Sequence, residues 1–203
     1  MNIMEILLNN TILDEFEMIN FEYLVTPTYY NLESGQQEYR LYSYLSTFFD
    51  NTIILDLGTS HGTSAIALSH NNNNTVISYD IVNCINNENH AIYKKSNVIF
   101  KIQNILNDLN EEMLSKVKIV MIDIDHYGSI EKNIIDRLHE LKFSGIIILD
   151  DVFNHPDKEI NNCMKMLWDS LNYENTTKIN VTKYGHWSGT GILLMNTDIE
   201  IKF

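Results

Sequence analysis

Carboxylates at the ends of two apolar runs are the residues of this sequence best suited to chemistry. Asp123 lies at the end of the run 116–124, and Asp150 and Asp151 directly follow the run 145–149. Neighbouring strands lie about 5 Å apart, so these carboxylates would converge on one rim, where they must protonate, separate or share a cation. Oxygen ligands favour a hard divalent ion, above all Mg²⁺. The alternative is a set of solvated loop residues.

A second candidate site is the segment 53–68, where an apolar run ends in Asp-x-Gly-x-x-x-Gly and leads into a helical pattern. Asp56, Gly58 and Gly62 mark a strand, a tight turn and a helix N-terminus, a combination that binds nucleotide-like ligands. The glycine spacing differs from the Gly-x-Gly-x-x-Gly of dinucleotide sites and disfavours a dinucleotide oxidoreductase. The alternative is a turn that needs glycine only for its backbone geometry.

Asp80 ends another apolar run, 75–81, about 20 residues beyond this turn. A carboxylate at that place accepts hydrogen bonds from the ribose hydroxyls of a bound nucleotide. An acidic residue at a strand end also serves as a helix cap, so both roles stay open for Asp80.

The candidate site residues lie in a part of the sequence where apolar runs alternate with helical patterns. We expect strands at 52–57, 75–81, 97–102, 116–124 and 145–149. Continuous Val/Ile runs separated by helices are typical of a doubly wound parallel sheet.

The C-terminal part of the chain follows a different pattern. A long helix is expected from Asp157 to Tyr173, followed by two β-like runs at 178–183 and 191–196. The connection between these runs is too short for a crossover helix, so they should form an antiparallel hairpin.

The first 31 residues carry apolar side chains at helical spacing, for example Ile3 and Leu7. We predict short helices here, either packed on the main domain as a cap or folded over its ligand site as a lid. Tyr29 and Tyr30 are candidates to cover a ligand or to pack against the core.

A better helical pattern spans 32–49, with Ser34 as its candidate cap, and leads into the first strand of the sheet. No linker-like tract divides the chain, and its length suits one well-cored domain. We therefore expect a single domain, 1–203, whose core is 32–203.

The overall charge restricts the partners of the protein. Lys and Arg number 14 against 27 Asp and Glu, which gives a net charge of −13. Such a field repels phosphate backbones and argues against nucleic acid as a partner.

Cys84 and Cys163 lack metal-site spacing and are expected to be free thiols. No apolar run approaches the roughly 20 residues of a membrane span, and the N-terminus lacks a signal pattern. We expect a soluble cytoplasmic protein, with a homo-oligomer left open.

The Asp-x-Gly-x-x-x-Gly pattern after a strand resembles motif I of class I S-adenosylmethionine (SAM) methyltransferases. The resemblance implies an α/β fold, a Rossmann-like doubly wound seven-stranded sheet, mostly parallel with a C-terminal antiparallel hairpin and helices on both faces. It also implies that Asp80 binds the ribose of SAM and that Asn104 lies near its adenine. The remaining implied SAM contacts are Asp56, Gly58, Thr59, Ser60, Gly62, Ser64 and Asp123.

Asp123-x-x-His126 followed by Asp150-Asp151 resembles the metal-dependent O-methyltransferases. The resemblance implies that Asp123, Asp150 and Asp151 are metal ligands and that His126 is the base that deprotonates the acceptor. Catechol and caffeoyl-CoA types usually have Asp-Asn in place of Asp150-Asp151 and Lys in place of His126. Both departures bring the chain closer to the sugar-modifying type of macrolide and cephamycin pathways.

The predicted function is Mg²⁺-assisted, SAM-dependent methylation of a hydroxyl on a small molecule, with a sugar or sugar nucleotide favoured over a catechol. A metal-independent methyltransferase on another acceptor and a non-catalytic SAM- or nucleotide-binding module stay open as alternatives. Several further residues have two possible roles. His155, His186 and Trp187 are acceptor-pocket or structural residues, and Asp125 either orients His126 or contacts the SAM amino group; His61 is expected to give backbone contacts to SAM.

Overall fold

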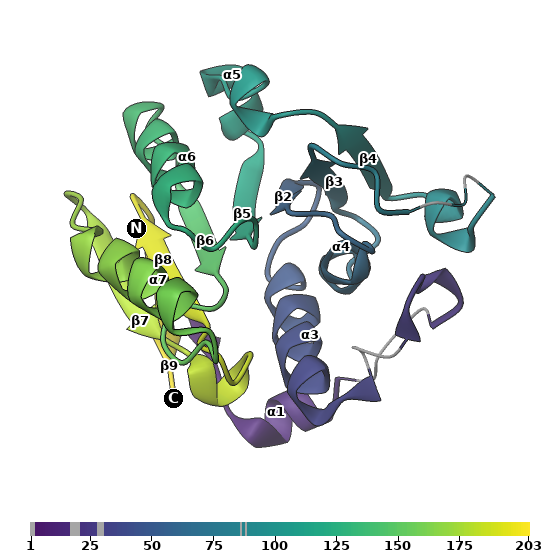
Figure 1. The fold of residues 1–203 in the computed structure, drawn as a ribbon, viewed down its shortest axis with the longest axis horizontal. Helices are drawn as coiled ribbons and strands as arrows, with labels where there is room; N and C mark the ends of the chain where they lie inside the picture. The colour runs from purple at the N-terminus through teal and green to yellow at the C-terminus, as the bar shows by residue number, and fades with distance from the viewer. Residues whose placement is uncertain (1–2, 17–20, 28–30, 86, 88) are drawn as a thin grey trace.

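The computed structural model describes residues 3–16, 21–27, 31–85, 87 and 89–203 (Figure 1). The predicted ligand-covering residues Tyr29 and Tyr30 lie outside these ranges.

A seven-stranded sheet forms the centre of the described chain, in the order β4-β3-β2-β5-β6-β8-β7. Its strands are β2 (Ile53–Leu57), β3 (Thr75–Asp80), β4 (Val98–Ile102), β5 (Val117–Ile122), β6 (Gly145–Leu149), β7 (Thr176–Asn180) and β8 (Gly191–Met195). The pairs among the first five of these strands are parallel, whereas β8 is antiparallel to both β6 and β7. The predicted doubly wound, mostly parallel sheet with a C-terminal antiparallel hairpin is confirmed.

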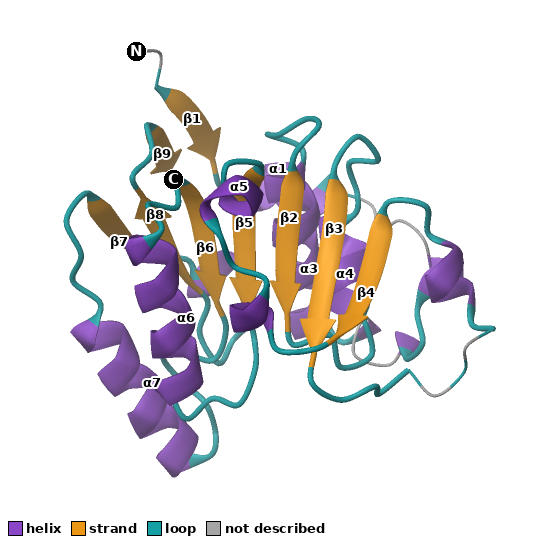
Figure 2. Cartoon of the chain, turned by 90° about the horizontal axis from the view of Figure 1, so that it is seen from above, coloured by secondary structure: helices purple, strands orange, loops and turns teal. Residues whose placement is uncertain are grey.

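Helices cover both faces of this sheet, as Figure 2 shows. On one face lie α3 (Glu33–Ser46) and α4 (Thr63–Leu68). On the other lie α5 (Glu111–Leu114), α6 (Ser129–Glu140) and α7 (Lys158–Ser170). Successive side chains along a strand point to opposite faces of the sheet. The buried apolar side chains therefore divide into two clusters, one on each face. Ile54 packs in the cluster with α3 and α4, and Leu55 in the cluster with α6 and α7.

Short 3₁₀ helices occur in the connections, at η1 (Phe21–Tyr23), η2 (Ala91–Lys94), η3 (Ile105–Asn107) and η4 (Thr182–Tyr184). The cap of α7 is Asp157, whose Oδ1 accepts hydrogen bonds from Glu159 N (2.8 Å) and Ile160 N (3.2 Å). The prediction of Ser34 as the cap of α3 is wrong, because the N-cap is Leu32 and Ser34 lies inside the helix.

The N-terminal part differs from the predicted run of short helices. Residues Met4–Leu7 form the strand β1, which pairs in parallel with β9 (Ile199–Lys202) in a separate two-stranded sheet. Ile6 is fully buried, whereas Leu7 is exposed, which is the alternation of a strand. A helix does follow, α1 (Asn10–Asp14), capped by Asn9. The described N-terminal residues pack in the core cluster of α3, and their predicted role as a lid stays a prediction.

Within the described ranges, every helix is too short or too polar to cross a bilayer.

Candidate functional site

The turn between β2 and α4 depends on two glycines with positive φ. Gly58 (φ +101°) lies so close to β5 that an added Cβ would be 1.7 Å from the carbonyl oxygen of Asp123. Gly62 (φ +77°) is the N-cap of α4, and its α-carbon faces Ile92 and Phe100. Positive φ is open to glycine without strain, so both positions require glycine to shape this turn.

Asp56 lies beneath the turn and is fully buried. Its Oδ2 accepts a hydrogen bond of 2.5 Å from Ser78 Oγ, and Ser78 Oγ also lies 2.7 Å from Thr59 Oγ1. Burial raises the pKa of the Asp56 carboxyl to about 7, although its hydrogen bonds with Ser78 and Ser64 oppose the rise. Asp56 therefore supports the turn through buried hydrogen bonds and does not line the cavity beside the turn.

Two adjoining cavities lie around the turn, and Gly58 lines both. The first, which we call the polar cavity, has a volume of about 270 Å³. Its lining includes the predicted SAM contacts Thr59, Ser60 and Ser64, and also Asp123 and Asp150. The three carboxylates predicted to converge, Asp123, Asp150 and Asp151, are called the acidic rim below. The turn and two of them, Asp123 and Asp150, therefore face one shared space.

The second space, the apolar cavity, has a volume of about 120 Å³. Much of its wall is aliphatic and comes from Leu57, Ile81, Ile105, Ile124, Ile130 and Ile134. Asp80 and Asn104, the two residues predicted to contact ribose and adenine, both line it. Asp80 Oδ2 also accepts a hydrogen bond from Ser60 N (2.9 Å) and thereby ties the end of β3 to the turn. Asn104 caps η3 through Leu106 N (2.9 Å).

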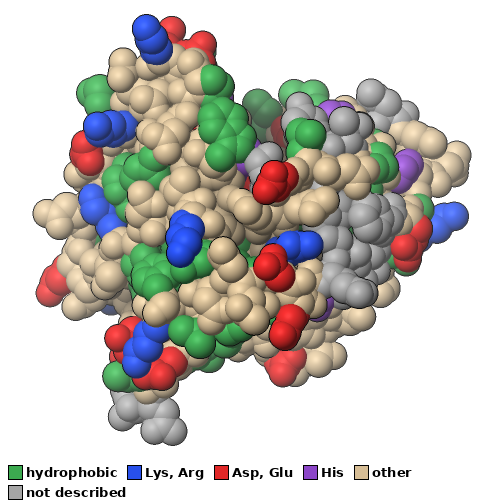
Figure 3. Space-filling view, turned by 90° about the horizontal axis from the view of Figure 1, so that it is seen from below, with side chains coloured by type: hydrophobic (Ala, Val, Ile, Leu, Met, Phe, Trp, Pro, Cys, Tyr) green, Lys and Arg blue, Asp and Glu red, His purple; other side chains and the backbone are tan. Residues whose placement is uncertain are grey.

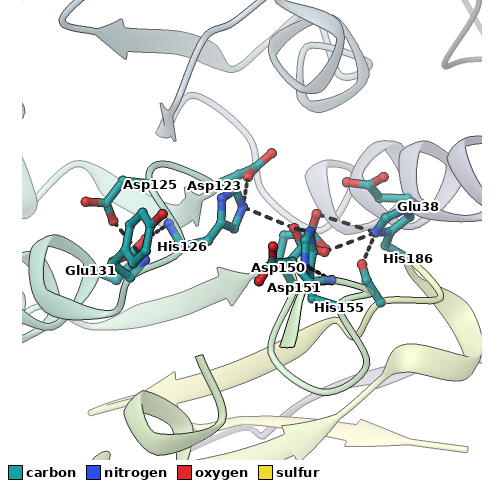
Figure 4. Close-up of polar contacts among 12 residues, drawn as sticks. Glu38, Asp123, Asp125, His126, Glu131, Asp150, Asp151, His155 and His186 are labelled. Carbon is teal, nitrogen blue, oxygen red and sulfur yellow. Dashed lines mark hydrogen bonds and ion pairs between the residues drawn. The ribbon is translucent and has the colours of Figure 1, made fainter. Parts of the chain in front are cut away.

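His126 lies between two carboxylates of the acidic rim (Figure 4). Its Nε2 is 2.7 Å from Asp123 Oδ1 and 3.2 Å from Asp151 Oδ2. Burial lowers the pKa of His126, but the contact with Asp123 and the charges of both carboxylates outweigh it and raise the pKa to about 9. At neutral pH His126 is therefore an imidazolium that must lose its proton before it can act as a base.

The loop after β5 holds His126 in a left-handed conformation, with φ +62°. Glu131, at the start of α6, is almost fully buried and accepts a hydrogen bond from His126 N (2.8 Å). Asp125 instead accepts from Tyr127 N (3.2 Å). Glu131, which the sequence analysis did not single out, thus positions the backbone of the predicted base.

Asp150 and Asp151 follow β6 and share one partner, because His186 Nδ1 lies 3.7 Å from Asp150 Oδ2 and 3.5 Å from Asp151 Oδ1. Asp151 has a φ of +58°, and its Oδ2 also lies near His126 and 3.7 Å from His155 Nε2. Asp150 forms a group with Glu38 and His186, each of which offers one ligand atom within 4.8 Å of the others. Figure 4 shows Glu38 on its helix opposite His186, with the two aspartates beside them.

Burial raises the pKa of Asp150 well above its usual value, and the charges of Glu38 and Asp123 add to the effect. Burial also raises the pKa of Glu38 to about 7, although the charge of His186 opposes the rise. Two buried carboxylates that resist ionisation beside a histidine form a donor set that fits a divalent cation. The predicted set of Asp123, Asp150 and Asp151 stays untested.

Glu38 was missed by the sequence analysis, although the sequence holds a signal for it. Glu38 stands at i, with Leu41, Tyr42 and Leu45 at i+3, i+4 and i+7, so it is the acidic member of an apolar helix stripe.

Of the loop residues whose role was open, His186 and His61 line the polar cavity, while Trp187 is about half exposed.

Solved structures of other proteins share this arrangement of strands and helices. Cofactor-bound Rv0187 from MTB aligns with a TM-score of 0.57 at 16% identity, over 82% of this chain and 83% of that one. The SAH-bound methyltransferase PaMTH1 from Podospora anserina gives 0.54 at 13% identity, over 83% and 84%. The chain therefore has the same fold as these solved structures.

The O-methyltransferase TomG from Streptomyces achromogenes, involved in tomaymycin synthesis and solved with SAM, gives a TM-score of 0.54 at 16% identity, over 76% of this chain and 78% of that one. No protein-family model matches the chain. No curated protein matches it in sequence. At these identities the neighbours support the predicted fold alone.

Proposed function

We propose that this protein transfers the methyl group of SAM to a hydroxyl of a small molecule, with assistance from a divalent cation. One observation carries the proposal. The glycine turn expected to hold SAM lines the same polar cavity as Asp123 and Asp150, two carboxylates of the acidic rim expected to hold the acceptor. A methyl donor on the turn would thus share one cavity with these carboxylates, which is the proximity that a two-substrate transfer needs.

The two cavities suit the two ends of SAM. SAM supplies a methyl group on a cationic sulfonium, which is the electrophile of the reaction. The aliphatic wall of the apolar cavity would enclose the adenine, with Asp80 beside it to accept ribose hydroxyls. Thr59, Ser60 and Ser64 would contact the methionine part in the polar cavity. Asp56, buried beneath them, would act through the shape of the turn.

The acidic rim would hold and deprotonate the acceptor. A divalent cation there would supply positive charge that stabilises a deprotonated hydroxyl. Asp150 belongs both to the ligand set predicted from sequence and to the group in the structure. His126, fixed by Asp123 and Asp151, is the side chain proposed to take the hydroxyl proton, which it can do only in its neutral form, after its own proton has left.

The polar lining favours a hydroxyl-rich acceptor, and we propose a sugar or sugar nucleotide ahead of a catechol. Glu38, Asp123, Asp150 and His186 all face the cavity, and such groups hydrogen-bond to several hydroxyls. In the described part of the face in Figure 3, basic and acidic side chains are interspersed without a continuous basic area. With a net charge of −13, this surface does not favour nucleic acid.

The test begins with calorimetric titration of the protein with SAM and with S-adenosylhomocysteine. Labelled methyl transfer from SAM should then be followed over a panel of sugars, sugar nucleotides and catechols, with EDTA added and a divalent metal restored. We expect EDTA to abolish transfer, and Asp150→Asn to lose transfer but keep SAM binding. Asp169→Asn, which changes an exposed carboxylate in α7 that lines neither cavity, is the matched control. Absence of binding of either ligand would refute the proposed function, and transfer that survives EDTA would refute the role of the metal.

A further inference from the structure

We propose that Glu38, Asp150 and His186 bind a transition-metal dication such as Mn²⁺ in preference to Mg²⁺. The inference rests on the proposed function for the role of this metal, whereas its binding can be tested separately. The ligand set differs from the one predicted from sequence in two of its three members.

The three side chains come from distant parts of the chain. Glu38 lies in α3, Asp150 follows β6, and His186 lies between β7 and β8. One ligand atom from each lies within 4.8 Å of the others, a spacing that a single ion can bridge with small side-chain adjustments. All three line the polar cavity, so an ion among them would be open to a bound acceptor.

A second observation, independent of this grouping, points to a missing ligand. Asp150 is only 6% exposed, and its Oδ1 is buried without a hydrogen-bond partner among the described residues. A buried carboxylate oxygen without a partner costs free energy unless a cation or a donor satisfies it. Asp150 lines the cavity that it shares with Glu38 and His186, so an ion there would meet this need.

Asp123 and Asp151 are less available for an ion because each already contacts the His126 ring. The ring lies between them, with Nε2 at 2.7 Å from one carboxylate and 3.2 Å from the other. An ion shared by Asp123 and Asp151 would have to displace this ring. Among the described contacts, His126 approaches neither Glu38 nor Asp150, whereas His186 Nδ1 lies 3.7 Å from Asp150 Oδ2 and 3.5 Å from Asp151 Oδ1.

A neighbouring hydroxyl fixes the orientation of Glu38. The buried Tyr42 hydroxyl donates a hydrogen bond of 2.8 Å to Glu38 Oε1, and hydrogen bonds of this kind orient metal ligands in proteins. The hydroxyl of Ser188, which is also fully buried, contacts His186 Nδ1. This nitrogen faces Asp150, so an ion bound to it would replace the serine contact. The backbone bond from Val152 N to Gly189 O (2.9 Å) holds the loop of His186 against the segment after β6.

The chemistry of the donors selects the class of metal. Two carboxylates accept Mg²⁺ or Mn²⁺, but an imidazole ligand favours transition metals over Mg²⁺. One histidine with two carboxylates is therefore a site for Mn²⁺ or a similar first-row dication.

The experiment titrates the intact protein with Mn²⁺ and measures free Mn²⁺ by its EPR signal. We expect one Mn²⁺ per chain, with affinity at least about tenfold higher than that for Mg²⁺ measured by competition. Glu38→Gln, which keeps the size of the side chain, and His186→Ala should each weaken Mn²⁺ binding by about tenfold or more. Pulsed EPR should show a nitrogen coupling to bound Mn²⁺ that His186→Ala removes.

His155→Ala is the matched control, because it removes a histidine near Asp151 that is outside the proposed ligand group. It should leave the nitrogen coupling and the Mn²⁺ affinity unchanged. Circular dichroism of each variant establishes that it is folded. The proposal is overturned if Mn²⁺ does not bind, or if Asp123→Asn and Asp151→Asn abolish binding while Glu38→Gln and His186→Ala do not. SAM titration in parallel separates the two proposals: Mn²⁺ binding without SAM binding refutes the proposed function and leaves the metal site standing.

Discussion

Replacing Gly58 with alanine tests whether glycine is needed for the packing of the turn against β5. At a φ of +101°, a residue that carries a Cβ stores about 1–3 kcal/mol of backbone strain. The new Cβ would also lie 1.7 Å from the Asp123 carbonyl oxygen, whereas real Cβ contacts lie at or above 3.0 Å. The ends of β2 and β5 would therefore have to separate by about 1 Å.

This separation has a further cost. It breaks the 2.9 Å hydrogen bond from Asp123 N to Leu57 O, which contributes about 1 kcal/mol. We expect Gly58→Ala to lower the free energy of unfolding by about 2–4 kcal/mol. Because Gly58 lines both cavities, we also expect SAM affinity to fall by about tenfold or more, equivalent to about 1.4 kcal/mol.

Gly62→Ala is the matched comparison. There φ is +77°, and the nearest atom to an added Cβ is Ile92 Cδ1 at 2.5 Å, the end of a flexible side chain. We expect a loss of only about 1–2 kcal/mol, mainly from the left-handed backbone. Urea denaturation followed by circular dichroism measures both losses, and calorimetry measures SAM binding. If Gly58→Ala is as stable as Gly62→Ala and binds SAM as tightly as the unchanged protein, the reasoning about this turn is wrong.

Three further predictions concern other parts of the molecule. Asp80→Ala should weaken SAM binding in calorimetry, because it removes the carboxylate at the mouth of the apolar cavity; unchanged affinity would exclude its role with ribose. Ile6→Ala should lower the free energy of unfolding by about 2–4 kcal/mol because Ile6 is fully buried, whereas Leu7→Ala should lower it by about 0.5 kcal/mol or less because Leu7 is exposed. Equal losses for the two variants in urea denaturation would contradict the assignment of this segment as the strand β1. Burial raises the pKa of the Asp136 carboxyl, but hydrogen bonds from Lys132 and Tyr173 outweigh burial and lower this pKa. The ionised Asp136 therefore stabilises the folded protein above the usual carboxyl pKa, and this contribution is lost as pH falls through the lowered pKa. Asp136→Asn should therefore destabilise at neutral pH and little at strongly acidic pH, and a loss independent of pH would refute this.

The central part of the fold was predictable because its signals are local. Buried parallel strands read as continuous apolar runs, and 145–149 matches β6 at both ends. The glycine spacing of the turn is likewise visible in sequence, since positive φ at Gly58 and Gly62 leaves few other residue types.

What the sequence could not supply depends on contacts between distant segments. Ile3 and Leu7 have helical spacing, but β1 is a strand because β9, from the far end of the chain, pairs with it. His126 carries the sequence signal of a base, yet only the structure shows it as an imidazolium between Asp123 and Asp151. Glu38 joins Asp150 only through the tertiary fold, which brings their side chains together from positions more than a hundred residues apart in the sequence.

The pairing of β1 with β9 also bears on how the molecule is made. As the chain leaves the ribosome, β1 emerges well before β9, because all seven strands of the large sheet lie between these two strands in the sequence. During that time the apolar side chains of Ile6 and Leu8, both fully buried in the final structure, have no β9 beside them. Long-range strand pairings form slowly, and exposed strand edges favour aggregation. His186 also follows the turn and the aspartates in the sequence, so a chain stalled before His186 would carry the turn and the aspartates without a complete site.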